Sequence, residues 1–120
     1  MSTETTDERR QRRARAITDA LPAPEGIRDD WGGFIIDAVQ DGVWARGTLT
    51  QAERSMITIA ALCALHGPNE LEIHIQRGLR NGLSREQISE IIMHMAIYGG
   101  FPVAVEGMHT AKDVFDAETD

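Results

Sequence analysis

Two pairs of side chains suited to proton transfer recur at helical spacing in the second half of the sequence. Glu70 and His74 are four residues apart, and so are His94 and Tyr98. Residues four apart lie on the same face of a helix, so each pair can present its polar groups together. A histidine titrates near neutral pH, and a carboxylate one turn away can orient its ring or keep it protonated. The spacing therefore indicates general acid–base chemistry, with these four residues as the catalytic candidates.

The same pairs also have structural interpretations. His74 lies in a polar stripe with Glu70, Arg77 and Asn81, where it could be a half-exposed member of an ion-paired helix face. His94 and Tyr98 could lie at the edge of the core and bond to backbone groups through the ring N–H and the hydroxyl. Spacing alone does not decide between these interpretations and catalysis.

An arginine precedes the least polar part of the sequence. Arg54 is followed by the run 56–65, in which Thr58 is the one polar residue. A guanidinium beside so apolar a helix needs an anion, because an unpaired buried charge is strongly destabilising. The anion is either a nearby acid, such as Glu53 or Glu70, or the carboxylate of a substrate. Arginine binds a carboxylate through two parallel hydrogen bonds.

Trp44 and Arg46 form a second candidate for substrate binding. An indole offers a large apolar surface, and a guanidinium offers a partner for a carboxylate. The two side chains are interpreted either as a lid over a substrate or as packing of the domain.

The cysteine and the histidines show no metal-binding spacing. Cys63 is the one cysteine, and it lies within the apolar run, which favours a structural thiol. The four histidines fall on separate predicted helices: His66, His74, His94 and His109. There is no Cys-x-x-Cys pair, no phosphate-binding glycine loop and no Gly-x-Ser-x-Gly motif. We therefore expect no metal, and these absences argue against phosphoryl transfer and serine hydrolysis.

No segment shows the alternation of apolar and polar residues that is typical of a strand. We therefore expect helices to position all of these residues. The motifs Thr50-x-x-Glu53 and Ser84-x-x-Gln87 are capping boxes that begin helices over 50–65 and 84–98. Glycine and proline residues delimit four further helices, 9–21, 31–41, 69–80 and 102–115, of which Gly42 ends the second. We predict an all-α fold, a helical bundle of about six helices, with an arginine-rich arm at 1–28 and one helical domain at 29–120.

Some of the predicted helices are apolar on two sides. In the helix over 84–98, Ile88, Ile92 and Met95 share one stripe, whereas Met93 and Ile97 point away from it. A domain of this size cannot bury both faces by itself. The pattern predicts a homo-oligomer.

The charge of the chain limits its partners. Twelve basic and nineteen acidic residues give a net charge of −7, which argues against nucleic acid as a partner. Five of the basic residues lie in the arm, which we expect to dock on the acidic body of its own or a neighbouring chain: Arg9, Arg10, Arg12, Arg13 and Arg15. The apolar run 56–65 is about half the ~20 residues that cross a bilayer. With no apolar signal segment at the start, we expect a cytoplasmic protein without membrane contact.

Three segments together resemble the carboxymuconolactone decarboxylase family: 53–60 (ERSMITIA), 70–83 (ELEIHIQRGLRNGL) and 94–102 (HMAIYGGFP). The resemblance covers roughly 44–115. It implies a fold shared with alkyl hydroperoxidase D, assembled into trimers or hexamers with pockets near subunit interfaces. It also implies cofactor-free decarboxylation of a small carboxylated lactone, as in the β-ketoadipate pathway of aromatic degradation. The redox branch of that superfamily uses a Cys-x-x-Cys pair, which this chain lacks.

The resemblance suggests roles for the candidate residues. His74 would be the acid, oriented by Glu70. Either His94 or Tyr98 would donate a hydrogen bond to the oxyanion. Either Arg54 or Arg46 would bind a carboxylate of the substrate.

The chain departs from the family pattern at Glu106. Where the family commonly has Ala-Ala-Asn-Ala after the proline, this chain reads VAVEG over 103–107. A carboxylate at Glu106 would repel an anionic substrate unless it were protonated or turned away. The alternatives are therefore an isomerase, cyclase or hydrolase acting on another lactone or enone, with Glu106 as the base in a cyclase or isomerase, or a non-catalytic oligomer that binds a small molecule.

Overall fold

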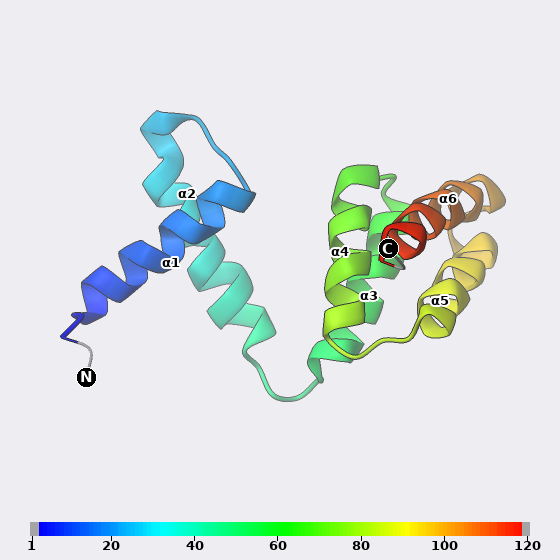
Figure 1. Cartoon of the computed structure of the whole chain (residues 1–120), viewed down its shortest axis with the longest axis horizontal. Coiled ribbons are helices and arrows are strands. Elements are labelled where there is room, and N and C mark those ends of the chain that lie inside the picture. The colour runs from blue at the N-terminus through cyan, green and yellow to red at the C-terminus, as the bar shows by residue number, and fades with distance from the viewer. Residues whose placement is uncertain (1–2, 119–120) are drawn as a thin grey trace. The chain divides into compact units, whose positions relative to one another are not determined.

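A computed structural model describes residues 3–118 of the chain (Figure 1). These residues form helices and no strand, which confirms the predicted all-α class. They divide into two compact units, and the division falls between Thr48 and Leu49. We call them the N-terminal unit and the C-terminal unit. The predicted boundary after residue 28 lies inside the N-terminal unit, because the segment that follows it packs on the arm.

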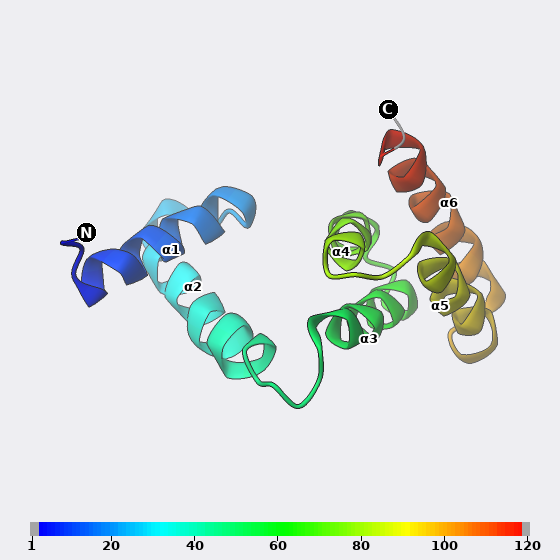
Figure 2. The ribbon, with the colours of Figure 1, turned by 60° about the horizontal axis from the view of Figure 1, so that its bottom comes forward.

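The N-terminal unit is a helical hairpin with a very small core. Its elements are α1 (Thr6–Ala20), the 3₁₀ turn η1 (Glu25–Ile27), α2 (Arg28–Phe34) and the π-helix η2 (Ile35–Trp44). Figure 2 shows α1 lying across α2. A Cβ atom on Gly32 would lie 3.0 Å from the Cβ of Ala14, so the glycine permits this close approach. The buried apolar side chains of the unit are Ile17, Ile35 and Ile36.

The prediction that Gly42 ends the second helix was wrong. The helix continues to Trp44 as a π-helix, and Ala45 N donates to Gln40 O at 2.8 Å in the wider i to i+5 pattern. A Cβ atom at position 42 would overlap the carbonyl oxygen of Asp37. Gly42 thus allows the wide turn to continue instead of stopping the helix.

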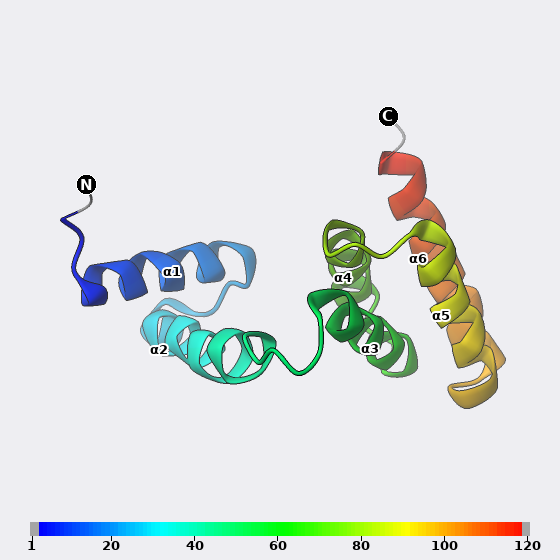
Figure 3. The same cartoon turned by 90° about the horizontal axis from the view of Figure 1, so that it is seen from below.

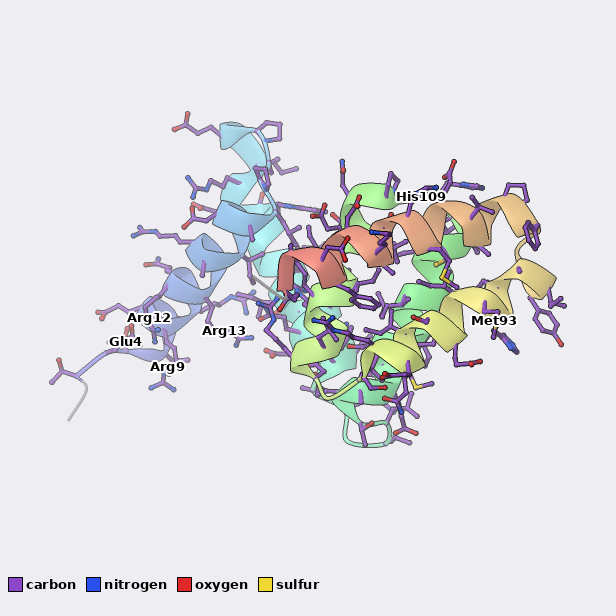
Figure 4. All side chains as sticks on the ribbon, turned by 45° about the vertical axis from the view of Figure 1, so that its right-hand side comes forward. Glu4, Arg9, Arg12, Arg13, Met93 and His109 are labelled. Atoms are coloured by element: carbon purple, nitrogen blue, oxygen red, sulfur yellow. The ribbon has the colours of Figure 1, made fainter. Side chains whose placement is uncertain are left out.

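Ion pairs hold the arginine-rich helix within its own unit. Arg10 donates from both terminal nitrogens to the Asp37 carboxylate, each at 2.9 Å, and so links α1 to η2. Arg12 binds Glu4 through two hydrogen bonds of 2.8 Å. Figure 4 shows Glu4 between the labelled side chains of Arg9 and Arg12. Further pairs are Arg13–Asp41 and Arg28–Asp19, each at 3.0 Å. Much of the positive charge of the arm is therefore neutralised locally.

The C-terminal unit consists of two antiparallel helix pairs. Its elements are α3 (Gln51–Ala64), α4 (Pro68–Arg80), α5 (Arg85–Tyr98) and α6 (Phe101–Glu118). Figures 2 and 3 show α5 and α6 running side by side, joined by a short turn. Both predicted capping boxes are present, with Thr50 and Glu53 bonded reciprocally at the start of α3, and Ser84 and Gln87 at the start of α5.

A continuous apolar core lies between these four helices. It comprises Ile59, Cys63, Leu71, Ile75, Leu83, Ile88, Ile92, Val103, Ala104, Ala111 and Val114. Burying each large aliphatic side chain contributes about 1.5–3 kcal/mol. Glycine lets α6 approach closely, since a Cβ on Gly107 would lie 2.9 Å from Ile92 Cγ2. Cys63 is buried in this core, which raises the pKa of its thiol and fits the predicted structural role.

Candidate active site

The Glu70–His74 pair lies one turn apart on α4, as the spacing predicted. His74 Nε2 is 4.0 Å from Glu70 Oε2, and the histidine side chain is 15% exposed whereas the glutamate is 49% exposed. On the other side of the ring, His74 Nδ1 is buried and has no hydrogen-bond partner among residues 3–118. A buried polar atom is normally paired, so this nitrogen stands out as one whose hydrogen-bonding capacity residues 3–118 leave unused.

The environment of His74 favours its neutral form. Burial lowers the pKa of His74 below its usual value, the nearby Arg77 lowers it further, and Glu70 acts in the opposite direction. The two depressing causes outweigh the carboxylate because the ion-pair distance is long and Glu70 is half solvated. The lowered pKa therefore favours an uncharged imidazole at neutral pH in the free protein.

A buried hydrogen bond ties α4 to the segment that carries Arg54. Asn81, at the end of α4, donates from Nδ2 to Ser55 Oγ at 2.9 Å, and Ser55 has no exposed surface. Arg54 itself is half-buried in the first turns of α3. Its neighbour Glu53 is engaged in the capping box, whose backbone and side-chain hydrogen bonds from Thr50 lower the pKa of Glu53. The sequence reasoning missed the Ser55–Asn81 link, although a serine directly before the apolar run was a signal for it.

His94 and Tyr98 form a pair of their own on α5. Their rings stack with centroids 4.9 Å apart at an interplanar angle of 28°. Both side chains are exposed, Tyr98 to 75%, so they do not lie at the core edge with buried polar groups. The pair offers an imidazole and a phenol on one surface, on a different helix from His74.

Glu106 lies on the exposed side of α6, beside the end of α3. Its Oε2 is 3.6 Å from Nδ1 of His66, and both side chains are more than half exposed. His66 adopts φ of 55°, a left-handed conformation that is uncommon outside glycine. The two side chains border a cleft of about 20 Å³ that also includes Cys63 and Thr110. This cleft holds about one water molecule and is too small for a lactone.

The remaining candidates belong to the N-terminal unit. Trp44 is the last residue of η2 and is partly buried, and Arg46 is exposed in the segment that follows.

Two further features of the described residues bear on the expected partners. No group of three or more His, Cys, Asp or Glu side chains between residues 3 and 118 is arranged to hold a metal ion. In the same part of the chain, no helix is both long and apolar enough to cross a membrane.

Comparison with known proteins gives one family and two named relatives. The model of the carboxymuconolactone decarboxylase family matches residues 33–113. The 4-carboxymuconolactone decarboxylase of Acinetobacter baylyi (strain ATCC 33305 / BD413 / ADP1) is 36% identical over 99 residues, which cover 82% of this chain and 74% of that protein. The nitrosuccinic acid decarboxylase npaB of Metarhizium robertsii (strain ARSEF 23 / ATCC MYA-3075) is 32% identical over 78 residues, 62% of this chain and 54% of the fungal protein.

Proposed function

This chain belongs to the carboxymuconolactone decarboxylase family, and we propose that it is a carboxy-lyase that decarboxylates a small carboxylated lactone resembling γ-carboxymuconolactone. The names of both relatives describe decarboxylases, which supports the reaction class. The bacterial relative, matched over most of both chains, supports the lactone as the substrate. The proposal places the reaction in the cytoplasmic breakdown of aromatic compounds.

Such a substrate needs no organic cofactor to accept electrons. When the carbon–carbon bond to the carboxylate breaks, its electron pair moves through the ring alkene to the lactone carbonyl oxygen. Carbon dioxide leaves, and an enolate-like oxyanion remains. One proton must then be added to carbon. The protein must therefore stabilise the oxyanion and deliver one proton.

The observation that carries the proposal is the buried, unpartnered Nδ1 of His74. In the free protein the imidazole is neutral, but an anionic substrate beside it would favour the imidazolium, since an opposite charge stabilises the charged form. The substrate would thus recruit the proton that the reaction consumes. His74 gives that proton to the substrate carbon and becomes neutral again, and Glu70 keeps the ring oriented.

We propose supporting roles for the other candidates. His94 or Tyr98 would donate a hydrogen bond to the oxyanion, and Arg54 or Arg46 would bind a carboxylate, with Trp44 and Glu106 beside the substrate. His74 and the His94–Tyr98 pair lie on different helices, and Tyr98 is largely solvated in a single chain. Assembly into a trimer or hexamer would complete the site by adding a second copy over these groups.

The proposal is tested by incubating the purified protein with γ-carboxymuconolactone and following carbon dioxide release and the enol-lactone product. The wild type is expected to turn over the lactone, and His74→Gln to lower kcat by about 10²–10⁴-fold, the usual contribution of a general acid. Glu70→Gln should lower kcat as well. Glu72→Gln is the matched control, because Glu72 is an exposed carboxylate on the same helix. No turnover by the folded wild type would refute the lactone as substrate.

A second candidate substrate is a nitro-substituted acid, favoured by the similarity to the fungal nitrosuccinic acid decarboxylase. A nitro group next to the carboxylate accepts the electron pair as a nitronate, so the same residues could serve. Turnover of nitrosuccinate without turnover of the lactone would support this alternative. A folded protein inactive on both would favour an isomerase, cyclase or hydrolase, or a non-catalytic binding oligomer.

A further inference from the structure

One face of the α5–α6 hairpin is apolar and exposed. The large side chains on it that lie in solvent are Met93, Ile97, Tyr98, Phe101, Val105 and Met108. Ile97, Tyr98 and Phe101 are the most exposed, at 72–79%, and they flank the Gly99–Gly100 turn at the tip of the hairpin. Contiguous apolar surface of this kind marks an interaction site, whereas single exposed residues do not. We call this surface the hairpin face.

The hairpin face also contains a hollow. A groove of about 380 Å³ runs between α5 and α6, and it is lined by Met93, Ala96, Phe101, Ala104, Val105, Met108, His109 and Lys112. Figure 4 labels one residue from each side of it, Met93 on α5 and His109 on α6. Projecting side chains thus lie next to a depression on the same surface.

A small molecule could fill the groove, but it could not cover the hairpin tip. Ile97 and Tyr98 project at the tip and are not among the groove-lining residues. Only a second protein surface is large enough to shield both the groove and the tip from water. The occupant is therefore a macromolecule.

Charge and shape favour a second copy of this chain as that macromolecule. Two copies with a net charge of −7 each repel one another, so they meet best where acids are few. The groove lining contains no Asp or Glu, and its ionisable members are His109 and Lys112, the latter bonded to Asp116 at 2.7 Å. A surface with both projecting side chains and a hollow can also pair with the same surface of another copy about a two-fold axis, an arrangement that a hexamer allows.

We propose that the hairpin face is a contact between copies of this chain, in which the tip of one hairpin covers the groove of the other. The proposal rests on the homo-oligomer of the proposed function and names its surface. It also gives Tyr98 a role that a single chain does not allow. In water a phenol stabilises an oxyanion weakly, but covered by a second copy it does so strongly.

Light scattering after size exclusion tests the proposal through mass, independently of turnover. Ile97→Glu places a charge at the tip, and we expect it to raise the dissociation constant by about 30-fold or more, as for a central interface residue. Circular dichroism reports whether the variant remains helical. Leu65→Glu is the matched control, since Leu65 is 74% exposed but lies at the end of α3, off the hairpin face, and this variant should keep the wild-type mass.

Hydrogen exchange of the wild type tests the same face without mutation. On going from dilute to concentrated protein, amides in 93–108 should gain protection, while exposed amides at the start of α4 should not. The proposal is overturned if the wild type stays monomeric, if Ile97→Glu keeps the wild-type mass, or if protection appears only outside 93–108. A protein that associates through this face yet turns over no lactone would support the interface and refute the proposed substrate.

Discussion

The N-terminal unit and the C-terminal unit are each stabilised by a different kind of internal interaction. In the N-terminal unit, three isoleucines form the buried apolar core, and exposed ion pairs such as Arg10–Asp37 link its helices. In the C-terminal unit, eleven buried residues form the core, and Glu70 and His74 lie on one of the helices that surround it. Exposed ion pairs contribute little and are screened by salt, whereas a close-packed core fixes side chains in place. The C-terminal unit, with the larger core, is therefore the one suited to position His74 for its proposed role.

Truncating a buried isoleucine to alanine should destabilise the protein more in the C-terminal core than in the N-terminal core. This is the largest difference we expect. Ile75 and Ile36 are both fully buried. Ile75→Ala should destabilise the protein by about 2–5 kcal/mol, because the dense core cannot collapse around the cavity. Ile36→Ala should cost less, since the small hairpin can relax. Urea unfolding followed by circular dichroism measures both, with Ile75→Val as the control at about 0.5–1.5 kcal/mol. Equal losses would refute the contrast between the cores.

The π-helix of the N-terminal unit should be sensitive to a single methyl group. In Gly42→Ala, the new Cβ would overlap the carbonyl oxygen of Asp37, so η2 must change its geometry. We expect a loss of about 1–3 kcal/mol, comparable to overpacking elsewhere. Gly26→Ala is the control, because a Cβ there meets nothing within 4 Å. Thermal unfolding compares the two variants, and identical melting temperatures would show that η2 does not need the glycine.

The stability of the C-terminal unit should depend on pH through His74. Its pKa is lowered in the folded protein, so the unfolded chain binds the proton more readily. Stability is therefore full above the usual histidine pKa of about 6.5 and falls as pH drops toward the folded pKa. Between pH 7.5 and 5.5 the wild type should lose more stability than His74→Gln, as measured by urea midpoints. An equal loss in both proteins would show that His74 is not the titrating group.

Salt should act on the N-terminal unit alone, and this is the smallest effect we expect. At 1 M salt the Debye length is about 3 Å, so the bridge between Arg10 and Asp37 is weakened. Hydrogen exchange should speed up in α1 and leave α3 unchanged. Arg10→Met should reproduce the effect at low salt. Arg15→Met is the control, because Arg15 is an exposed arginine of the same helix outside these bridges. Faster exchange in both units would remove the distinction between them.

Local signals in the sequence predicted much of the C-terminal unit. The capping boxes at Thr50 and Ser84 begin helices where expected, because a cap is decided by residues three positions apart. The outward direction of Met93 and Ile97 followed from helical periodicity alone. The π-helix was missed because glycine is a common helix terminator, and its use here depends on the Asp37 carbonyl.

The candidate site was less predictable because it depends on contacts between elements. The Glu70–His74 pair followed from spacing, but the buried Nδ1 and the lowered pKa of His74 depend on packing around α4. The pairing of Ser55 with Asn81 joins residues far apart in sequence. The proposed roles of His94 and Tyr98 depend on a second copy, whose placement one sequence does not specify.

In the proposed mechanism, His74 is neutral in the free protein, becomes protonated when the anionic substrate binds, and then delivers the proton. Initial rates on γ-carboxymuconolactone across pH 5 to 9 test this change in protonation. The pH dependence of kcat/KM reports the free protein and that of kcat the complex. Both should fall as pH rises, and the midpoint for kcat/KM should lie at the lower pH, below the usual histidine value. Coincident midpoints, or a profile that is unchanged in His74→Gln, would refute this role of His74.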